Sequence, residues 1–159
     1  MRTLTIIIAA LASLAAAAPA PEDAQPKPEA PKVSFRAVDV WVDPAAAKLA
    51  AYQVEIQYDA KTVKVVGVEG GEPQGFRDAP SYDEAGKAGG RIVLAAFVSD
   101  DAQATGGRQR VARLHVQVEG GAAPECTAKP VAAAQPGGKR IEAKAEAAAA
   151  QALEEKKGN

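Results

Sequence analysis

Few side chains in this sequence are of the types that perform nucleophilic or acid–base catalysis. His115 is the single histidine and Cys126 the single cysteine among 159 residues. A catalytic histidine needs a nucleophile and an orienting carboxylate, and none of the serines lies in a Gly-x-Ser-x-Gly turn. In the alternating stretch RVARLHVQVE, His115 falls on the polar face. We therefore interpret His115 as a surface residue and Cys126 as a small buried hydrophobe that has no disulfide partner.

Carboxylates gather in three loop segments, at Asp78, at Asp83-Glu84 and at Asp100-Asp101. Clustered carboxylates can hold calcium or serve as the acid and base of a glycosidase. Their spacing matches no calcium loop, and a glycosidase cleft is hard to build on residues 33–147. We interpret these groups as solvated turn residues. The sequence thus predicts no metal, no cofactor and no enzymatic activity.

Two aromatic residues are candidates for ligand binding by stacking. Trp41 lies on the polar face of the stretch RAVDVWVD, and Tyr82 lies in the loop-rich segment that follows residue 71. An exposed indole can stack on a sugar ring or anchor a protein partner. The whole chain holds only seven aromatic residues, three Phe, three Tyr and one Trp, whereas sugar sites usually combine several. Carbohydrate binding through Trp41 and Tyr82 is therefore our alternative hypothesis rather than our first.

The N-terminal residues have the composition of an export signal followed by a spacer. Arg2 precedes an apolar stretch and then a run of alanines, which is typical of a signal peptide and which we assign to residues 1–18. Residues 19–32 contain five prolines and no aromatic residue, as an extended linker does. We expect a secreted, periplasmic or cell-surface protein without a stable membrane span after processing. The net charge of −1 and the lack of a basic cluster argue against a nucleic-acid partner.

The elements that must position any site are short strands. Apolar and polar residues alternate over residues 36–43, 52–58 and 110–119, which predicts half-buried strands, and residues 63–69 form a further candidate. Asp59 follows the second strand, where its side chain can accept hydrogen bonds from the backbone of a turn. Turn residues recur at intervals of about 8–12 residues, which is typical of an all-β sandwich of eight to nine strands over residues 33–147. Residues 148–159 form an Ala-rich charged tail with helix propensity.

The stretch RIVLAAFVS, residues 91–99, has few polar side chains on either face. Under the assignment that we use, the inward residues are Val93, Ala95 and Phe97, and the outward residues are Ile92, Leu94 and Ala96. An outward apolar stripe on a sheet is either covered or used for binding. This stripe is the sharpest local indication of function in the sequence.

The middle of the chain resembles the cohesin domain, the receptor module of cellulose-degrading complexes. The resemblance starts from a Tyr-Asp pair that closes one strand, followed after three residues by an apolar pattern that ends in Glu-x-Gly. The matching residues are Tyr58, Asp59, Val63, Val65, Val66, Val68, Glu69 and Gly71. The later stretches GRIVLAAFVSDD and RVARLHVQVEGG are similar to the strands of the family that follow. The resemblance implies a nine-stranded sandwich with jelly-roll-like topology.

In the cohesin family the third, fifth, sixth and eighth strands form the partner-binding face. Carried over by position, this face would consist of Ala51, Gln53, Glu55, Leu94, Ala96 and Ser99. Many cohesins have an Asn/Asp pair for dockerin recognition at the positions of Ala51 and Gln53. This chain therefore resembles the family in the strands of the face but lacks that recognition pair. The sequence therefore predicts a non-catalytic, exported recognition module. Its partner would be an exported protein, either dockerin-like or another assembly component, and in the alternative hypothesis a polysaccharide.

Overall fold

Strands make up most of the computed structural model, which describes residues 32–121 and 123–150. These residues belong to one compact unit, 31–159. The expected signal peptide, almost all of the expected linker and residues 151–159 of the tail lie outside the described residues. The strands are β1 (Val33–Asp43), β2 (Lys48–Leu49), β3 (Ala51–Tyr58), β4 (Val63–Gly70), β5 (Ser81–Tyr82), β6 (Arg91–Phe97), β7 (Thr105–Gly106), β8 (Gln109–Glu119), β9 (Cys126–Ala134) and β10 (Lys144–Ala149).

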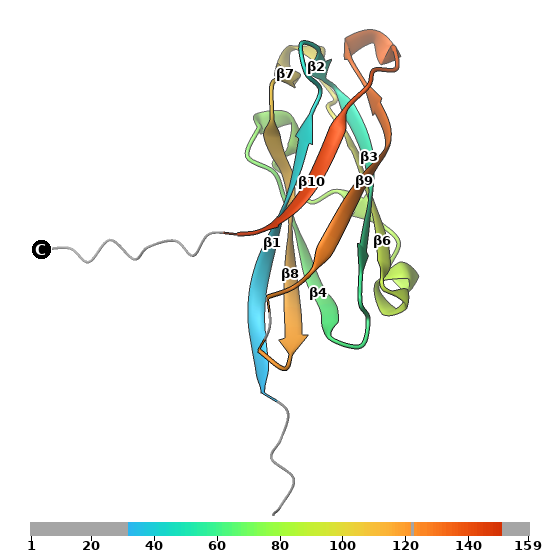
Figure 1. Cartoon of the computed structure of the whole chain (residues 1–159). Helices are drawn as coiled ribbons and strands as arrows, with labels where there is room; N and C mark the ends of the chain where they lie inside the picture. Colours follow the sequence, from blue (N-terminus) through green and yellow to red (C-terminus); the bar gives the residue numbers. More distant parts are fainter. Residues whose placement is uncertain (1–31, 122, 151–159) are drawn as a thin grey trace, which may run out of the picture. The chain divides into compact units, whose positions relative to one another are not determined.

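Two antiparallel sheets of four strands face each other (Figure 1). One has the strand order β10-β1-β8-β4 and the other the order β5-β6-β3-β9, and β2 and β7 pair with each other at one end. Short 3₁₀ turns occur at residues 74–76, 85–89, 101–103 and 136–138. The predicted all-β sandwich is confirmed, with three of its strands only two residues long.

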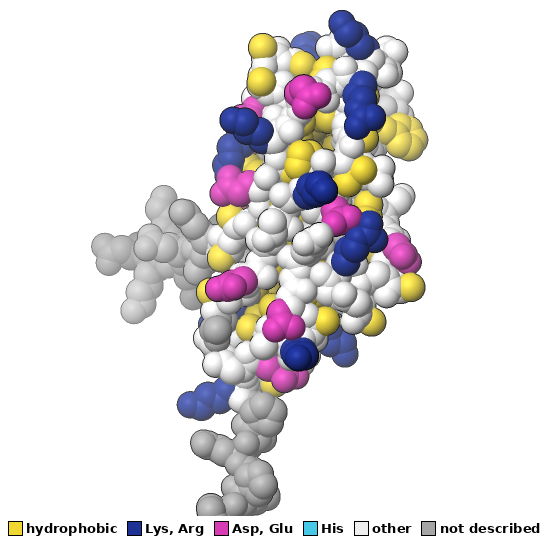
Figure 2. Space-filling view, turned by 45° about the vertical axis from the view of Figure 1, so that its right-hand side comes forward, with side chains coloured by type: hydrophobic (Ala, Val, Ile, Leu, Met, Phe, Trp, Pro, Cys, Tyr) yellow, Lys and Arg dark blue, Asp and Glu magenta, His cyan; other side chains and the backbone are white. Residues whose placement is uncertain are grey.

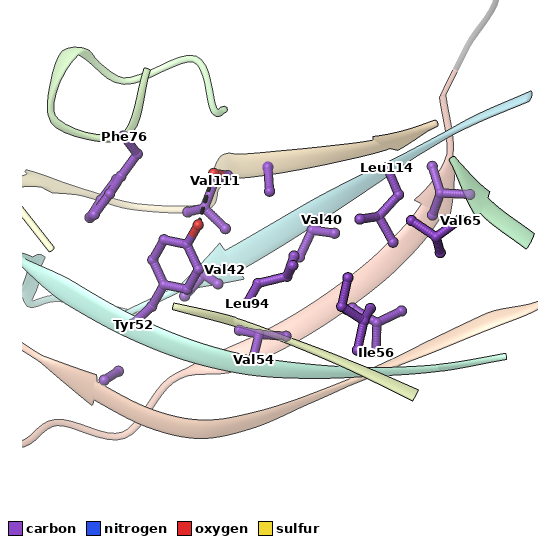
Figure 3. Packing of buried hydrophobic residues seen from close by; sticks show 14 of the residues in the cluster. Val40, Val42, Tyr52, Val54, Ile56, Val65, Phe76, Leu94, Val111 and Leu114 are labelled. Carbon is purple, nitrogen blue, oxygen red and sulfur yellow. Dashed lines mark hydrogen bonds between the residues drawn. The ribbon is translucent and has the colours of Figure 1, made fainter. Parts of the chain in front are cut away.

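The alternation read from the sequence sets the inner faces of three strands. Val38, Val40 and Val42 of β1 are buried, as are Tyr52, Val54, Ile56 and Tyr58 of β3 and Ala112, Leu114, Val116 and Val118 of β8. Figure 3 shows side chains from both sheets meeting in one layer. Burial of this apolar area is the main favourable term for folding, at about 25 cal/mol for each Å² removed from water.

Tyr52 connects the two sheets through a polar contact inside the core. Its hydroxyl donates a hydrogen bond to the carbonyl oxygen of Val111 on β8, at 3.1 Å, as drawn in Figure 3. Its ring meets Phe76 edge-on with 5.2 Å between the ring centroids. Burial raises the pKa of Tyr52. The buried hydroxyl is thus satisfied, as buried polar groups usually are.

The turn between β3 and β4 is built on Asp59, as the sequence predicted. The side-chain Oδ1 of Asp59 accepts a hydrogen bond from the backbone N–H of Lys61 at 2.9 Å, and its carbonyl oxygen accepts one from the N–H of Val63 at 2.8 Å. Asp59 is therefore a structural residue of the turn.

The first residues of the Ala-rich tail depart from its helix propensity, because Ala148 and Ala149 belong to a strand. Residues Lys144–Ala149 form β10, which pairs with β1 from Val38↔Ala149 to Asp43↔Lys144. The strand thus runs past the expected domain boundary at residue 147. Pairing with a neighbouring strand outweighs the preference of alanine for helices here.

Candidate functional site

The outer face of the sheet β5-β6-β3-β9 contains three of the residues predicted for partner binding. Ala51, Gln53 and Glu55 of β3 are partly exposed on this face, next to residues of β6 and β9. This sheet contains the third, fifth and sixth strands of the chain, which the resemblance named, but its fourth strand is β9, and β8 belongs to the other sheet. Ser99 is exposed in the loop directly after β6, close to the end of the same face.

The predicted orientation of β6 is wrong, and this removes Leu94 and Ala96 from the outer face. Leu94 is fully buried, with 0% of its surface exposed, and Ala96 packs against the core. The reason is the register with β3, in which Leu94 pairs with the inward Val54 and Ala96 with the inward Tyr52. Residues directly opposite each other in a sheet share a face.

The residues of β6 that do face outward are Val93, Ala95 and Phe97. Phe97 is the most exposed large hydrophobic side chain of the described residues, with 75% of its surface accessible. The sequence contains a signal for this orientation. The charged Arg91 at the start of the strand is expected to face solvent, and side chains alternate between the two faces of a strand, so Val93, Ala95 and Phe97 lie on the same face as Arg91.

A shallow apolar hollow lies on this face beside Phe97. Its volume is about 350 Å³ and its lining comes almost entirely from small side chains. We call Ala51, Ala95, Ala132 and Ala134 the alanine patch; Gln53 and Arg140 also line the hollow. Phe97 stands at its border, since it pairs with Ala51 across β6 and β3. Figure 2, which turns the right-hand side of Figure 1 forward, shows hydrophobic surface between isolated basic and acidic side chains.

The other half of the face is polar. Glu55 Oε2 accepts a hydrogen bond from Arg91 Nε at 2.8 Å, and Glu55 Oε1 accepts one from Gln57 Nε2 at 2.7 Å. These contacts, the one from Gln57 first, hold the pKa of Glu55 below its usual range. The face therefore divides into an apolar half around Phe97 and a polar half around Glu55, as protein interfaces commonly do.

The opposite sheet presents charges that are already paired with one another. Asp39, which is buried, accepts hydrogen bonds from Arg113 Nε at 2.7 Å and from Arg113 Nη2 at 3.1 Å. Arg110 Nε lies 3.2 Å from Glu72 Oε1. His115 Nε2 lies 2.8 Å from Glu69 Oε2, and His115 is exposed, as predicted. Any ligand on this sheet would compete with these contacts.

The two candidate stacking residues lie on different sheets and each is next to a cation. The guanidinium carbon of Arg108 lies 4.1 Å from the centre of the Trp41 ring, and Lys87 Nζ lies 5.3 Å from the centre of the Tyr82 ring. Trp41 is on β1 and Tyr82 is on β5. They therefore cannot form one stacking platform.

The remaining candidates for chemistry have structural surroundings. Asp83 and Asp100 each accept a hydrogen bond from the backbone N–H two residues on, at 3.0 and 2.9 Å, in agreement with their interpretation as turn residues. Burial raises the pKa of Cys126 to about 11, so its thiol is neutral at pH 7. Residues 32–121 and 123–150 contain no group of three His, Cys, Asp or Glu side chains that could hold a metal ion. No helix within these ranges has the length and hydropathy to cross a membrane.

Comparison with known proteins identifies the architecture. No protein-family model and no curated protein matches the chain. Among solved structures, the CaDoc0917–CaCohA2 complex at pH 5.5 gives a TM-score of 0.56 at 17% identity, covering 69% of this chain and 82% of the other. The fold is that of a cohesin domain. The seventh ScaB type I cohesin from Pseudobacteroides cellulosolvens agrees, with a TM-score of 0.51 at 12% identity over 76% of this chain and 86% of that cohesin.

Proposed function

We propose that this protein is a non-catalytic docking module that binds a protein partner through the outer face of β5-β6-β3-β9. The observation that carries the proposal is the exposed Phe97 beside the alanine patch, on a sheet of a cohesin fold. An aromatic anchor next to a shallow apolar hollow, with polar groups at the border, is the usual anatomy of a binding hot spot.

The small side chains of the alanine patch indicate what the partner supplies. Alanines leave a shallow floor, so large apolar side chains on the partner would fill the hollow. Arg140 at its border and the pair Glu55–Arg91 would then fix the orientation of the partner. The structural neighbour CaCohA2 was crystallised as a complex with CaDoc0917. For this chain we propose an exported protein partner, either dockerin-like or another component of an extracellular assembly.

Export belongs to the proposal and depends on residues 1–18, whose sequence is typical of a signal peptide. After cleavage, the Pro-rich residues 19–32 would form an extended N-terminal segment ahead of the module. Mass spectrometry of the mature N-terminus from the culture medium and the cell envelope would check the cleavage. A mature chain that still begins at Met1 would contradict the export proposal.

A pair of variants on opposite sheets tests the binding face. Phe97→Asp places a charge in the apolar half of the face, and Val66→Asp places one at an exposed valine of β4 on the other sheet. Each purified variant serves as bait for the exported proteins of the producing cell, and captured proteins are then titrated by biolayer interferometry. We expect Val66→Asp to bind like the native chain and Phe97→Asp to lose at least about tenfold in affinity. Equal binding by both variants would refute the assignment of the face.

Carbohydrate binding through Trp41 and Tyr82 remains a prediction with less support. The two rings lie on different sheets, and Arg108 and Lys87 occupy positions next to them. A sugar on Trp41 would have to displace the Arg108 guanidinium or share the ring with it.

A further inference from the structure

Half of strand β1 has a neighbour on only one side. β8 pairs with β1 over Val33–Val42, whereas β10 pairs with it only over Val38–Asp43 (Figure 1). Among the residues that the structure describes, residues 33–36 thus form an open half-edge of the sheet. Its outward side chains are apolar and exposed, Val33 by 47% and Phe35 by 68%. An exposed strand edge with apolar side chains is a template for another strand.

The backbone groups of this half-edge are oriented for pairing. The N–H of Ala150 donates a hydrogen bond to the carbonyl oxygen of Ala37 at 2.8 Å, so the β10 ladder already reaches beyond Ala149. In an antiparallel pair, alternate residues direct both backbone groups to the same neighbour. Val33 and Phe35 therefore direct their N–H and C=O groups toward the open side, and Ser34 and Arg36 direct theirs toward β8.

We propose that residues 151–155 of this chain occupy the half-edge as a continuation of β10. The register is fixed by the pairs Val38↔Ala149 and Ala37↔Ala150. Continued without a bulge, it brings Ala152 opposite Phe35, Leu153 opposite Ser34 and Glu154 opposite Val33. The segment follows directly on the last paired residue, so its effective concentration at the half-edge far exceeds that of any separate chain. The proposal is independent of the docking face on the other sheet.

The side chains of residues 151–155 suit these positions. Leu153 extends the inward row of Ala145 and Ala147, toward a hollow of about 670 Å³ that Ala147 lines together with Val118 and Cys126. Arg36, which pairs with the buried Val116, is itself exposed.

The outward side chains and the charges fit as well. Ala152 leaves room for the Phe35 ring beside it. The same register brings Glu155 opposite Lys32, which is exposed. Opposite charges on directly opposed residues of neighbouring strands favour the register that brings them together. A second copy of the chain would instead bring its own Lys32 and Arg36 to the same edge.

Hydrogen exchange at single backbone amides tests the proposal on the full chain. The amides of Val33 and Phe35 should exchange about tenfold or more slowly in the native chain than in Ala152→Pro, which removes the N–H that would pair with Phe35. Ala152→Ser keeps this N–H and should keep the protection. The amides of Ser34 and Arg36, which face β8, should exchange equally in all three proteins, and those of Val40 and Leu114 report that the fold is intact.

Two results would overturn the proposal. If the Val33 and Phe35 amides exchange as fast in the native chain as in Ala152→Pro, residues 151–155 do not pair with the half-edge. If their protection rises with protein concentration, the occupant is a second copy. Protection that is independent of concentration and lost only in Ala152→Pro supports the tail as the occupant.

Discussion

Leu94 and Phe97 lie three residues apart on β6 and face opposite sides of the sheet, so they make a sharp test of the register. Leu94 is fully buried in the core and Phe97 is 75% exposed. Truncation of a fully buried leucine to alanine removes its packing and leaves a cavity, which costs about 2–5 kcal/mol. Truncation of an exposed side chain changes stability by less than about 0.5 kcal/mol. Leu94→Ala should therefore lower the melting temperature by roughly 8–20 °C, and Phe97→Ala should leave it nearly unchanged.

Urea unfolding followed by far-UV circular dichroism measures both variants on one scale. The midpoint should fall for Leu94→Ala at an unchanged slope, because a change in slope would mean that the unfolded state had changed as well. Leu94→Asp should not fold, since it adds the burial of a carboxylate to the lost packing. If Leu94→Ala were as stable as the native chain, or if Phe97→Ala lost as much stability as Leu94→Ala, the orientation of β6 and the docking face built on it would both be refuted.

Three further predictions concern pH, the turn and the single tryptophan. Burial raises the pKa of Tyr52 above its ordinary 10.0 and that of Cys126 from 9.0 to about 11. On raising the pH, Tyr52 and Cys126 lose their protons in the unfolded chain before they do so in the folded one. Their contribution to the free energy of unfolding is therefore complete below about pH 9 and falls as the pH rises further. Urea midpoints that stay level from pH 7 to 10.5 would contradict this prediction. Asp59→Ala should lose about 0.5–1.5 kcal/mol with the hydrogen bond to the Lys61 N–H, and Asp59→Asn should lose less, as measured by urea unfolding. Trp41 fluorescence should not change when plant or bacterial polysaccharides are added, and a saturable change would favour the carbohydrate hypothesis.

Alternation predicted the faces of β1, β3 and β8 because polar residues interrupt these strands at every second position. β6 offered almost no such interruption, and the one useful signal was the charge of Arg91 at its start. The inward Val54 on the neighbouring strand decides the orientation of Leu94, and strand register cannot be read from a single sequence. The assignment of Phe97 to the core is therefore wrong, because Phe97 lies on the same side of the strand as Arg91 and is 75% exposed.

The Ala-rich strand β10 and the buried Asp39 show a second limit. Ala148 and Ala149 begin the tail that has helix propensity in the sequence, and their pairing with β1 explains why they belong to a strand. Asp39 has a polar position in the sequence pattern, yet it is 7% exposed because Arg113 lies directly opposite on β8 and binds both of its carboxylate oxygens. Both features depend on contacts between residues more than 70 positions apart, which local pattern does not reveal.

The difference between the two outer faces gives a physical reason for placing the partner on one of them. On the sheet β10-β1-β8-β4, several charged groups are paired: Asp39 with Arg113, Glu72 with Arg110, and Glu146 with Arg108 at 2.9 Å. A partner that covered them would remove water from several charges whose attraction is already used, so desolvation would be a net cost.

On the sheet β5-β6-β3-β9, the ring of Phe97 and the alanine patch lose unfavourable contact with water when they are covered. The ion pair of Glu55 and Arg91 lies at one end of this face and can stay hydrated at the rim of an interface. Replacing Glu55 by Gln should therefore change the association rate and its salt dependence more than the dissociation rate, whereas Phe97→Ala should mainly speed dissociation. Kinetic traces at two salt concentrations separate the two effects, and a Glu55→Gln variant that dissociates as fast as Phe97→Ala would place Glu55 in the centre of the interface instead.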